Sequence, residues 1–74
     1  MKTYTFRGMR TDGMHFSLDF VAKNMREAVA KFANTRAADP NFPKAMNWSV
    51  TLQGSKTSHP VTRERWGHAF DGHV

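Results

Sequence analysis

Apolar and polar residues alternate from Met14 to Ala22, and this stretch is the clearest element of the sequence. Its even-numbered positions are apolar and its odd-numbered ones mostly polar, a period of two that is typical of a half-buried β-strand. The period then lengthens to that of one helix face, with apolar residues at i, i+3, i+4 and i+7: Met25, Ala28, Val29 and Phe32. The pattern therefore predicts a strand followed directly by a helix.

The ends of this helix are also marked in the sequence. Asn24 can cap the first turn, and Glu27 stands where a capping box places its acidic residue. We expect the helix to end at Ala37 or Ala38, because Pro40 disfavours a helical conformation in the residue before it.

A first strand is predicted at Thr3–Met9, where aromatic residues alternate with polar and β-branched ones. Asp12-Gly13 separates it from the next alternating run, and this dipeptide is a strong hairpin signal. Gly8 continues the inward face without a side chain, which indicates a bulge or the close approach of another element.

The C-terminal half is predicted to add a third strand at Asn47–Gln53. Gly54 follows it, at the position where a type II′ turn requires glycine. Thr57–Thr62 is a candidate for a short fourth strand, which Pro60 would confine to a sheet edge. We expect Arg63–Phe70 to make one or two helical turns whose aromatic residues pack on the core.

These elements predict an α+β fold: a three-stranded, or four-stranded, antiparallel-type sheet in β-β-α-β order, with one helix packed on one face. Short connections and a right-handed crossover favour the strand order 2-1-3, with the helix over the first strand. Phe42 is expected to fold back onto the core, and Arg36 to extend past the helix end. Residues 1–54 are the predicted core domain, and residues 55–74 a partly ordered C-terminal extension whose last four residues fray.

The sheet face opposite the helix is predicted to be mostly polar. By alternation it carries Thr3, Thr5, Arg7, His15, Ser17, Asp19, Val21, Ser49, Thr51 and Gln53. Since none of these is Phe, Tyr or Trp, the face cannot stack bases on such rings as RNA-recognition sheets do, unless the C-terminal segment brings Trp66 across it. Two arrangements stay open: the face is solvated, or the C-terminal segment lies over it.

The composition favours a polyanionic partner. The 74 residues carry a formal net charge of +5, spread along the chain without a polybasic arm. The absence of Cys excludes disulfides and thiolate metal sites. Without a signal-peptide core, or an apolar run near the ~20 residues that span a bilayer, we expect a soluble protein of the bacterial host cytoplasm with no membrane partner.

Two groups of polar residues invite a catalytic or metal-binding interpretation. One group shares a strand face: His15, Ser17 and Asp19. Successive outward side chains of a strand lie ~7 Å apart, which is too far for a hydrogen-bonded relay. The other group has metal-ligand donor types, but its spacing matches no ligand motif: His68, Asp71 and His73. We therefore predict no catalytic residue, no metal and no cofactor.

The predicted binding site is a set of cationic and aromatic residues near the turns. Its members are Arg7, Arg10, Lys56, Arg63, Arg65 and Trp66. Arg and Trp are common interface anchors, and Arg also binds phosphate groups. The residues form one site only if the C-terminal segment brings its members toward the first hairpin. In the alternative interpretation they are scattered solubilising charges, and Trp66 is part of the core.

The order of elements resembles that of small phage-encoded inhibitors, namely the β-β-α-β anti-CRISPR proteins and the short phage inhibitor of bacterial RNA polymerase. The residues that carry the resemblance are Phe16–Ala22, Asn24–Ala28 and Trp48–Gln53. In those proteins an alternating strand likewise runs into a capped helix containing Glu-Ala. Antitoxins and double-stranded-RNA-binding-like modules contain similar strand and helix elements. The polymerase inhibitor looks acidic where this chain is basic, whereas the basic anti-CRISPR proteins engage nucleic-acid-handling effector surfaces.

Three functions are compatible with these observations. The first is a non-enzymatic phage or mobile-element inhibitor that binds a bacterial protein or ribonucleoprotein complex, above all a CRISPR effector, and blocks its access to nucleic acid. The second is an architectural or regulatory protein that binds nucleic acid directly. The third is an antitoxin-like interaction module that oligomerises through an edge strand. A monomer and a homodimer both stay open.

Overall fold

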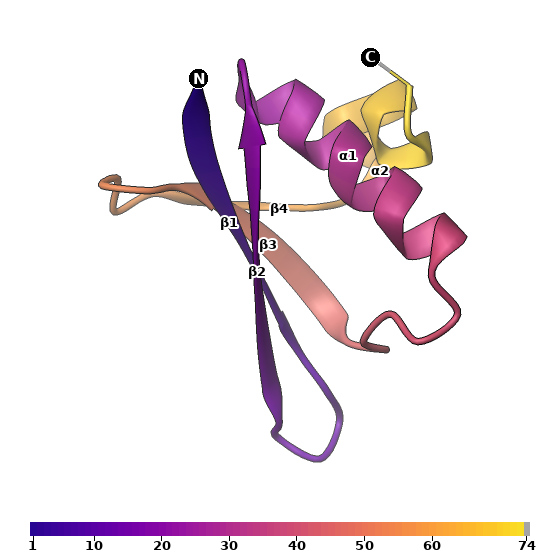
Figure 1. Ribbon diagram of the computed structural model, residues 1–74. Coiled ribbons are helices and arrows are strands. Elements are labelled where there is room, and N and C mark those ends of the chain that lie inside the picture. Colours follow the sequence, from indigo (N-terminus) through magenta and orange to yellow (C-terminus); the bar gives the residue numbers. More distant parts are fainter. Residues whose placement is uncertain (74) are drawn as a thin grey trace.

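The computed structural model describes residues 1–73, and within them the fold is α+β (Figure 1). Four strands form one antiparallel sheet in the order β2-β1-β3-β4. Their bounds are β1 Lys2–Met9, β2 His15–Ala22, β3 Met46–Leu52 and β4 Ser58–Pro60. The predicted fold class is confirmed, and the candidate fourth strand forms at the edge beside β3. Within residues 1–73, no helix combines the length and the apolar character needed to cross a membrane.

Helix α1, Met25–Ala38, lies on one face of the sheet (Figure 1). The Asn24 side chain accepts a hydrogen bond of 2.8 Å from the backbone N–H of Glu27, as the cap prediction requires. At the other end, the backbone N–H of Asp39 donates to the carbonyl of Thr35. Both predicted helix ends are therefore confirmed.

The β1–β2 hairpin is closed by a five-residue connection. Arg10 N–H donates to the Met14 carbonyl at 2.7 Å, and Gly13 N–H donates to the Arg10 carbonyl at 2.9 Å. Gly13 has a φ of +89°, which glycine adopts without strain. This is a type I turn followed by a glycine bulge, and it fixes the register in which Met9 faces His15.

The prediction of a type II′ turn between β3 and β4 is wrong. The turn is closed by a hydrogen bond of 2.9 Å from the Ser55 N–H to the Leu52 carbonyl, so Gly54 is its third residue. Gly54 has a φ of +90°, as the third residue of a type II turn requires. A type II′ turn would have the glycine in the second position, which Gln53 occupies.

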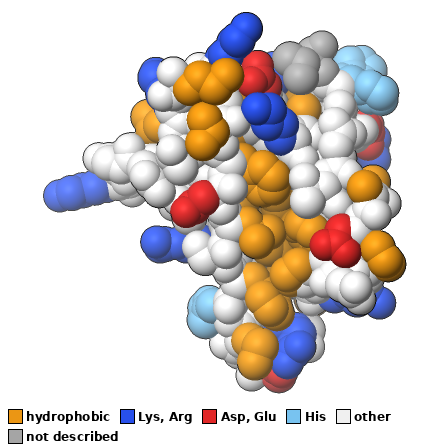
Figure 2. All heavy atoms as spheres, in the orientation of Figure 1, with side chains coloured by type: hydrophobic (Ala, Val, Ile, Leu, Met, Phe, Trp, Pro, Cys, Tyr) orange, Lys and Arg blue, Asp and Glu red, His pale blue; other side chains and the backbone are white. Residues whose placement is uncertain are grey.

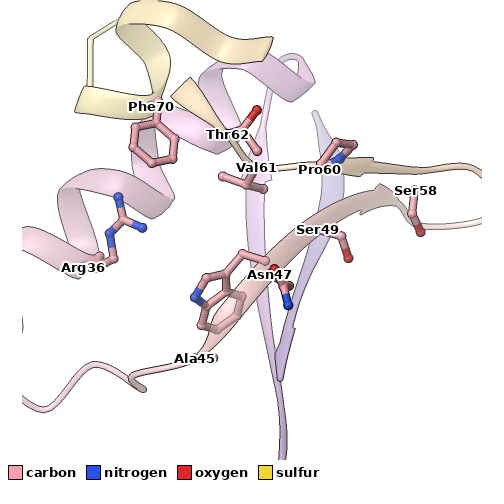
Figure 3. A pocket seen from close by; sticks show the side chains of 10 residues that line it. Arg36, Ala45, Asn47, Ser49, Ser58, Pro60, Val61, Thr62 and Phe70 are labelled. Carbon is pink, nitrogen blue, oxygen red and sulfur yellow. The ribbon is translucent and has the colours of Figure 1, made fainter. Parts of the chain in front are cut away.

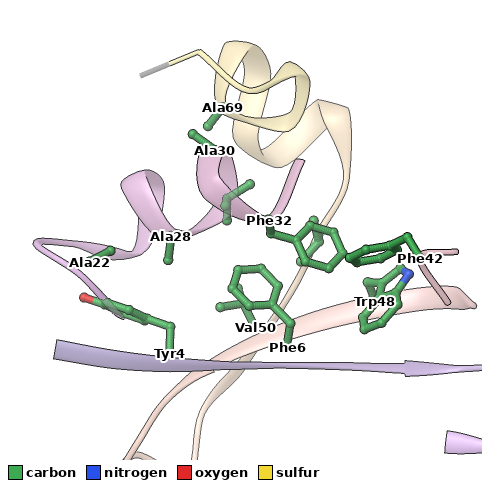
Figure 4. Packing of buried hydrophobic residues seen from close by; sticks show 12 residues of the cluster. Tyr4, Phe6, Ala22, Ala28, Ala30, Phe32, Phe42, Trp48, Val50 and Ala69 are labelled. Atoms are coloured by element: carbon green, nitrogen blue, oxygen red, sulfur yellow. The ribbon is translucent and has the colours of Figure 1, made fainter. Parts of the chain in front are cut away.

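The core lies between α1 and the sheet, and aromatic rings fill its centre (Figure 4). The Phe32 ring stacks on Phe6 with 4.5 Å between centroids, and it meets Trp48 and Phe42 edge-on at 5.0 and 5.4 Å. Phe42 thus folds back onto the core as expected. The other buried hydrophobic residues are Tyr4, Ala22, Ala28, Val29, Ala30, Ala33, Val50, Val61 and Ala69.

The inward row of β2 is less buried than the alternation predicts. Phe16, Leu18 and Phe20 pack against the core but stay half-buried. Helix α1 lies across the sheet and leaves the outer side of this strand uncovered. A band of hydrophobic side chains is therefore visible along β2 (Figure 2).

The C-terminal residues continue the same core. Helix α2, Arg63–Trp66, and the 3₁₀ helix η1, Gly67–Asp71, lie beside α1 on the helix-covered side of the sheet (Figure 1). The Asn34 side chain donates a hydrogen bond of 3.1 Å to the Gly72 carbonyl and ties this segment to α1. Of the two open arrangements, residues 1–73 adopt the one with an uncovered polar face. Val74, in the stretch expected to fray, lies outside the described residues.

Candidate binding surfaces

The six predicted binding residues lie in three places rather than one. Arg7, on β1, and Lys56, in the β3–β4 turn, line one hollow on the uncovered face. Arg10 lies at the β1–β2 hairpin, at the opposite end of the sheet from α2 (Figure 1). The remaining three belong to α2: Arg63, Arg65 and Trp66. The C-terminal segment therefore does not bring all six into a single site.

Cross-strand rows of hydroxyl groups cover the open face. In one row Thr5 donates a hydrogen bond of 2.8 Å to the Asp19 carboxylate on one side and faces Thr51 on the other. Thr51 in turn shares a hydrogen bond of 2.9 Å with Ser58. Each hydroxyl is thereby held in place by the strand register.

Arg7 occupies the next row of this face, between Ser17 and Ser49. It is exposed, and it lines a hollow of about 520 Å³ with Lys56 and the hydroxyls of the neighbouring row. Within residues 1–73, neither cation lies in an ion pair. Two cations beside fixed hydroxyl groups are suited to bind carboxylate or phosphate oxygens.

The second group surrounds α2. Arg65 Nη2 lies 2.7 Å from His59 Nδ1, and its guanidinium lies 5.8 Å from the centre of the Trp66 ring. Trp66 is half-buried against the core, and its indole N–H donates to the Pro60 carbonyl at 2.8 Å. These contacts favour the interpretation of Trp66 as a core residue with one exposed edge.

Two of the predicted cations are already paired with carboxylates. Arg63 Nη1 lies 2.6 Å from Asp71 Oδ2, and Arg10 Nε donates to Asp12 Oδ1 at 3.0 Å. Both pairs are exposed, and such pairs contribute little to stability. Their positive charge is nonetheless balanced locally, which makes them weaker candidates than Arg7 and Lys56.

The Arg10–Asp12 pair gives a prediction that NMR can test. The hydrogen bond from Arg10, followed by one from the Met14 backbone N–H, lowers the pKa of Asp12 to about 2. Because the folded-state pKa is depressed, the pair favours folding above the unfolded value of about 3.9 and loses its effect as pH falls toward 2. We expect the Asp12 carboxyl resonance to titrate near 2, and to return toward 3.9 in Arg10→Gln. A midpoint near 3.9 in the unsubstituted protein would contradict the pairing.

Sequence reasoning missed a second hollow, of about 510 Å³, on the helix-covered side (Figure 3). Its walls include Trp48, Val61 and Phe70, and Arg36 forms one side. Instead of extending past the helix end as expected, the Arg36 guanidinium lies over two rings, 5.4 Å from Phe32 and 5.2 Å from Phe70. Only the docking of η1 against α1 brings Phe70 here, so no local sequence pattern could reveal this hollow.

The two groups considered above as catalytic or metal-binding candidates do not form the contacts that such sites need in the described residues. On β2, Asp19 accepts its hydrogen bond from Thr5 rather than from His15 or Ser17. Asp71 binds Arg63 instead of facing the two C-terminal histidines. Among the residues that the structure describes, no three His, Asp or Glu side chains are grouped so as to hold a metal ion.

Comparison of the chain with protein-family models, curated protein sequences and solved structures gave no match. The resemblance to phage inhibitors therefore rests on the order of the secondary-structure elements alone.

Proposed function

We propose that the protein is a small, non-enzymatic inhibitor that binds a bacterial nucleic-acid-handling complex and blocks its access to nucleic acid. A phage or mobile element is the proposed source, and CRISPR effectors are the first target class to test, because of the resemblance in element order. The observation that carries the proposal is the uncovered sheet face, with Arg7 near its centre and Lys56 at its rim.

The chemistry of this face favours a protein or ribonucleoprotein surface over bare bases. Its hydroxyl rows and cations can bond carboxylates and phosphates, but its strand positions hold no Phe, Tyr or Trp ring on which bases could stack. The net charge of +5 adds long-range attraction to an acidic partner. Nucleic-acid-handling complexes offer both acidic protein surfaces and bound phosphates.

An affinity pull-down from bacterial lysate, run with and without nuclease, tests this proposal. The test variant is Arg7→Glu with Lys56→Glu, which reverses both cations of the hollow. The matched control is Arg26→Glu with Lys44→Glu, which makes the same change in net charge at exposed positions away from that hollow. We expect a discrete partner that survives nuclease, binds the control normally, and binds the test variant at least tenfold more weakly.

Equal partner binding by the test and control variants would contradict the assignment of the open face. Direct nucleic-acid binding remains the second candidate, favoured by the same two cations and hydroxyls. It predicts heterogeneous nucleic acid that is lost on nuclease treatment, and a log–log salt slope of about one per phosphate contacted. That result would replace the inhibitor proposal.

A further inference from the structure

The two edges of the sheet are built very differently. β4 is a three-residue edge strand that contains Pro60, and a short strand with a proline is poorly suited to further pairing. β2 is eight residues long and contains neither proline nor lysine nor arginine. Within residues 1–73, no strand pairs with its outer side. One edge is protected against pairing, whereas the other is open over most of its length, up to Val21 near its C-terminal end, whose carbonyl is bonded by a lysine of α1.

The register shows which backbone groups this open edge presents. Arg10 and Met14 form a hydrogen-bonded pair at the hairpin, and hydrogen-bonded and non-hydrogen-bonded pairs alternate along an antiparallel ladder. The even-numbered residues of β2 therefore bond to β1, whereas His15, Ser17, Asp19 and Val21 direct their N–H and C=O groups outward. Consistent with this, the Val21 carbonyl accepts a hydrogen bond of 2.8 Å from Lys31 Nζ, which comes from α1.

The open edge also carries an apolar row. Phe16, Leu18 and Phe20 are half-buried and pack against the core from the helix-covered side. Figure 2 shows a band of hydrophobic side chains beside β2. Met14, which precedes β2 in the hairpin connection, is 51% exposed. A strand added to β2 would therefore gain both backbone hydrogen bonds and apolar contacts.

We propose that a second copy of this chain occupies the edge, with its β2 antiparallel to the first and the two-fold axis beside Leu18. In this pairing Leu18 faces Leu18 of the other copy, and Phe16 faces Phe20 of the other copy. On the opposite side of the sheet, Ser17 faces Asp19 of the other copy. The inference does not depend on the proposed function, because it uses the edge of β2 and not the hollow on the open face.

The chemistry of β2 is what favours a copy of itself over an unrelated peptide. About this axis apolar residues meet apolar residues, and the carboxylate meets a hydroxyl group. This pairing also fits the alternation of hydrogen-bonded and non-hydrogen-bonded pairs. Ser17 and Asp19, whose N–H and C=O groups face outward, become a hydrogen-bonded pair. An axis beside Asp19 would instead place the two Asp19 carboxylates against each other, which is unfavourable. Among Lys, Arg, Asp and Glu, β2 contains only Asp19. The net charge of +5 is therefore not concentrated at the contact.

Substitutions at Ser17 test whether the edge is used. Ser17→Pro removes an outward N–H while leaving the β1–β2 hydrogen bonds in place, and Ser17→Ala is the control that keeps this N–H. In light scattering at about 100 μM, far above a micromolar Kd, we expect twice the 8.4 kDa chain mass for the unsubstituted protein and for Ser17→Ala. Ser17→Pro should give the 8.4 kDa monomer with an unchanged far-ultraviolet circular dichroism spectrum. A monomeric unsubstituted protein, or a dimeric Ser17→Pro, would overturn the inference.

Single cysteines test the register, and keep the inference testable if Ser17→Pro does not fold. The chain has no Cys, so any disulfide must come from the introduced residue. Leu18 would face its copy in a non-hydrogen-bonded pair, where Cα atoms lie about 4.5 Å apart, within the range of a disulfide. We expect Leu18→Cys to form a covalent dimer on mild oxidation, and Ser17→Cys and Asp19→Cys to stay uncrosslinked. Crosslinking of either control in place of Leu18→Cys would overturn the pairing about Leu18.

Discussion

Phe32→Ala is expected to unfold the protein, or to leave it close to its unfolding midpoint at room temperature. Phe32 is fully buried, and its ring contacts four other aromatic residues: Phe6, Phe20, Phe42 and Trp48. Truncating a buried Phe costs about 3–5 kcal/mol, including the cavity that remains. A core in a chain of this length rarely supplies more than about 3–5 kcal/mol of net stability. One substitution is therefore comparable to the whole free energy of unfolding.

Urea denaturation followed by circular dichroism measures this effect. Phe70→Ala is a matched control, since the same atoms are removed from a half-buried ring beside α1. The control should lose a smaller part of the free energy of unfolding and retain a cooperative transition. If Phe32→Ala kept the midpoint of the unsubstituted protein, Phe32 would not be the centre of the core.

Much of the fold could be predicted because local signals agreed with one another. The alternation through Phe20 and the helix spacing from Met25 define β2 and α1, and Asn24 separates them. The degree of burial could not be predicted in the same way. Phe6 and Phe20 both stand at inward positions of an alternating strand pattern, yet only Phe6 is fully buried. The difference depends on how α1 crosses the sheet, which no local pattern encodes.

The candidate site was less predictable than the fold, for a related reason. Alternation placed Arg7 on the uncovered face, and that position follows from the strand alone. Its neighbour Lys56 lies 49 positions later and approaches only because β3 pairs with β1 and then turns. The pairings of Arg63 with Asp71 and of Arg65 with His59 depend on how the C-terminal segment docks. Charge counting cannot distinguish such hydrogen-bonded cations from free ones.

The two proposals concern different surfaces of one sheet, and they are compatible. Pairing through β2 would join the two sheets edge to edge. In each copy the hollow lined by Arg7 and Lys56 would stay uncovered. Each of these cations would then occur twice on a continuous face. A dimer would therefore bind a partner with two matching acidic sites more tightly than either copy alone.

Gly8→Ala is expected to destabilise the protein by about 1–3 kcal/mol, although it adds a single methyl group. A Cβ at Gly8 would lie 2.6 Å from Cδ2 of the Trp48 indole and 2.8 Å from Cβ of Ala45. Trp48 cannot easily move away, because Phe32 and Phe42 hold its other side. Gly8 does not have the positive φ that would itself disfavour alanine, so the cost is one of space. Thermal unfolding measures it, and tryptophan fluorescence should report the displaced indole.

A double-mutant cycle with Trp48→Phe separates this steric conflict from a general loss of strand stability. The smaller ring of Phe fills less of this space and can turn away from the new methyl group more easily, so Gly8→Ala should cost less in the Trp48→Phe background than in the unsubstituted protein. Gly54→Ala is the contrasting control, because nothing lies within 4 Å of its added Cβ while its φ of +90° disfavours alanine. Its cost should be unaffected by Trp48→Phe. Additive effects of Gly8→Ala and Trp48→Phe would show that the close approach of β1 to the Trp48 ring is not what requires glycine here.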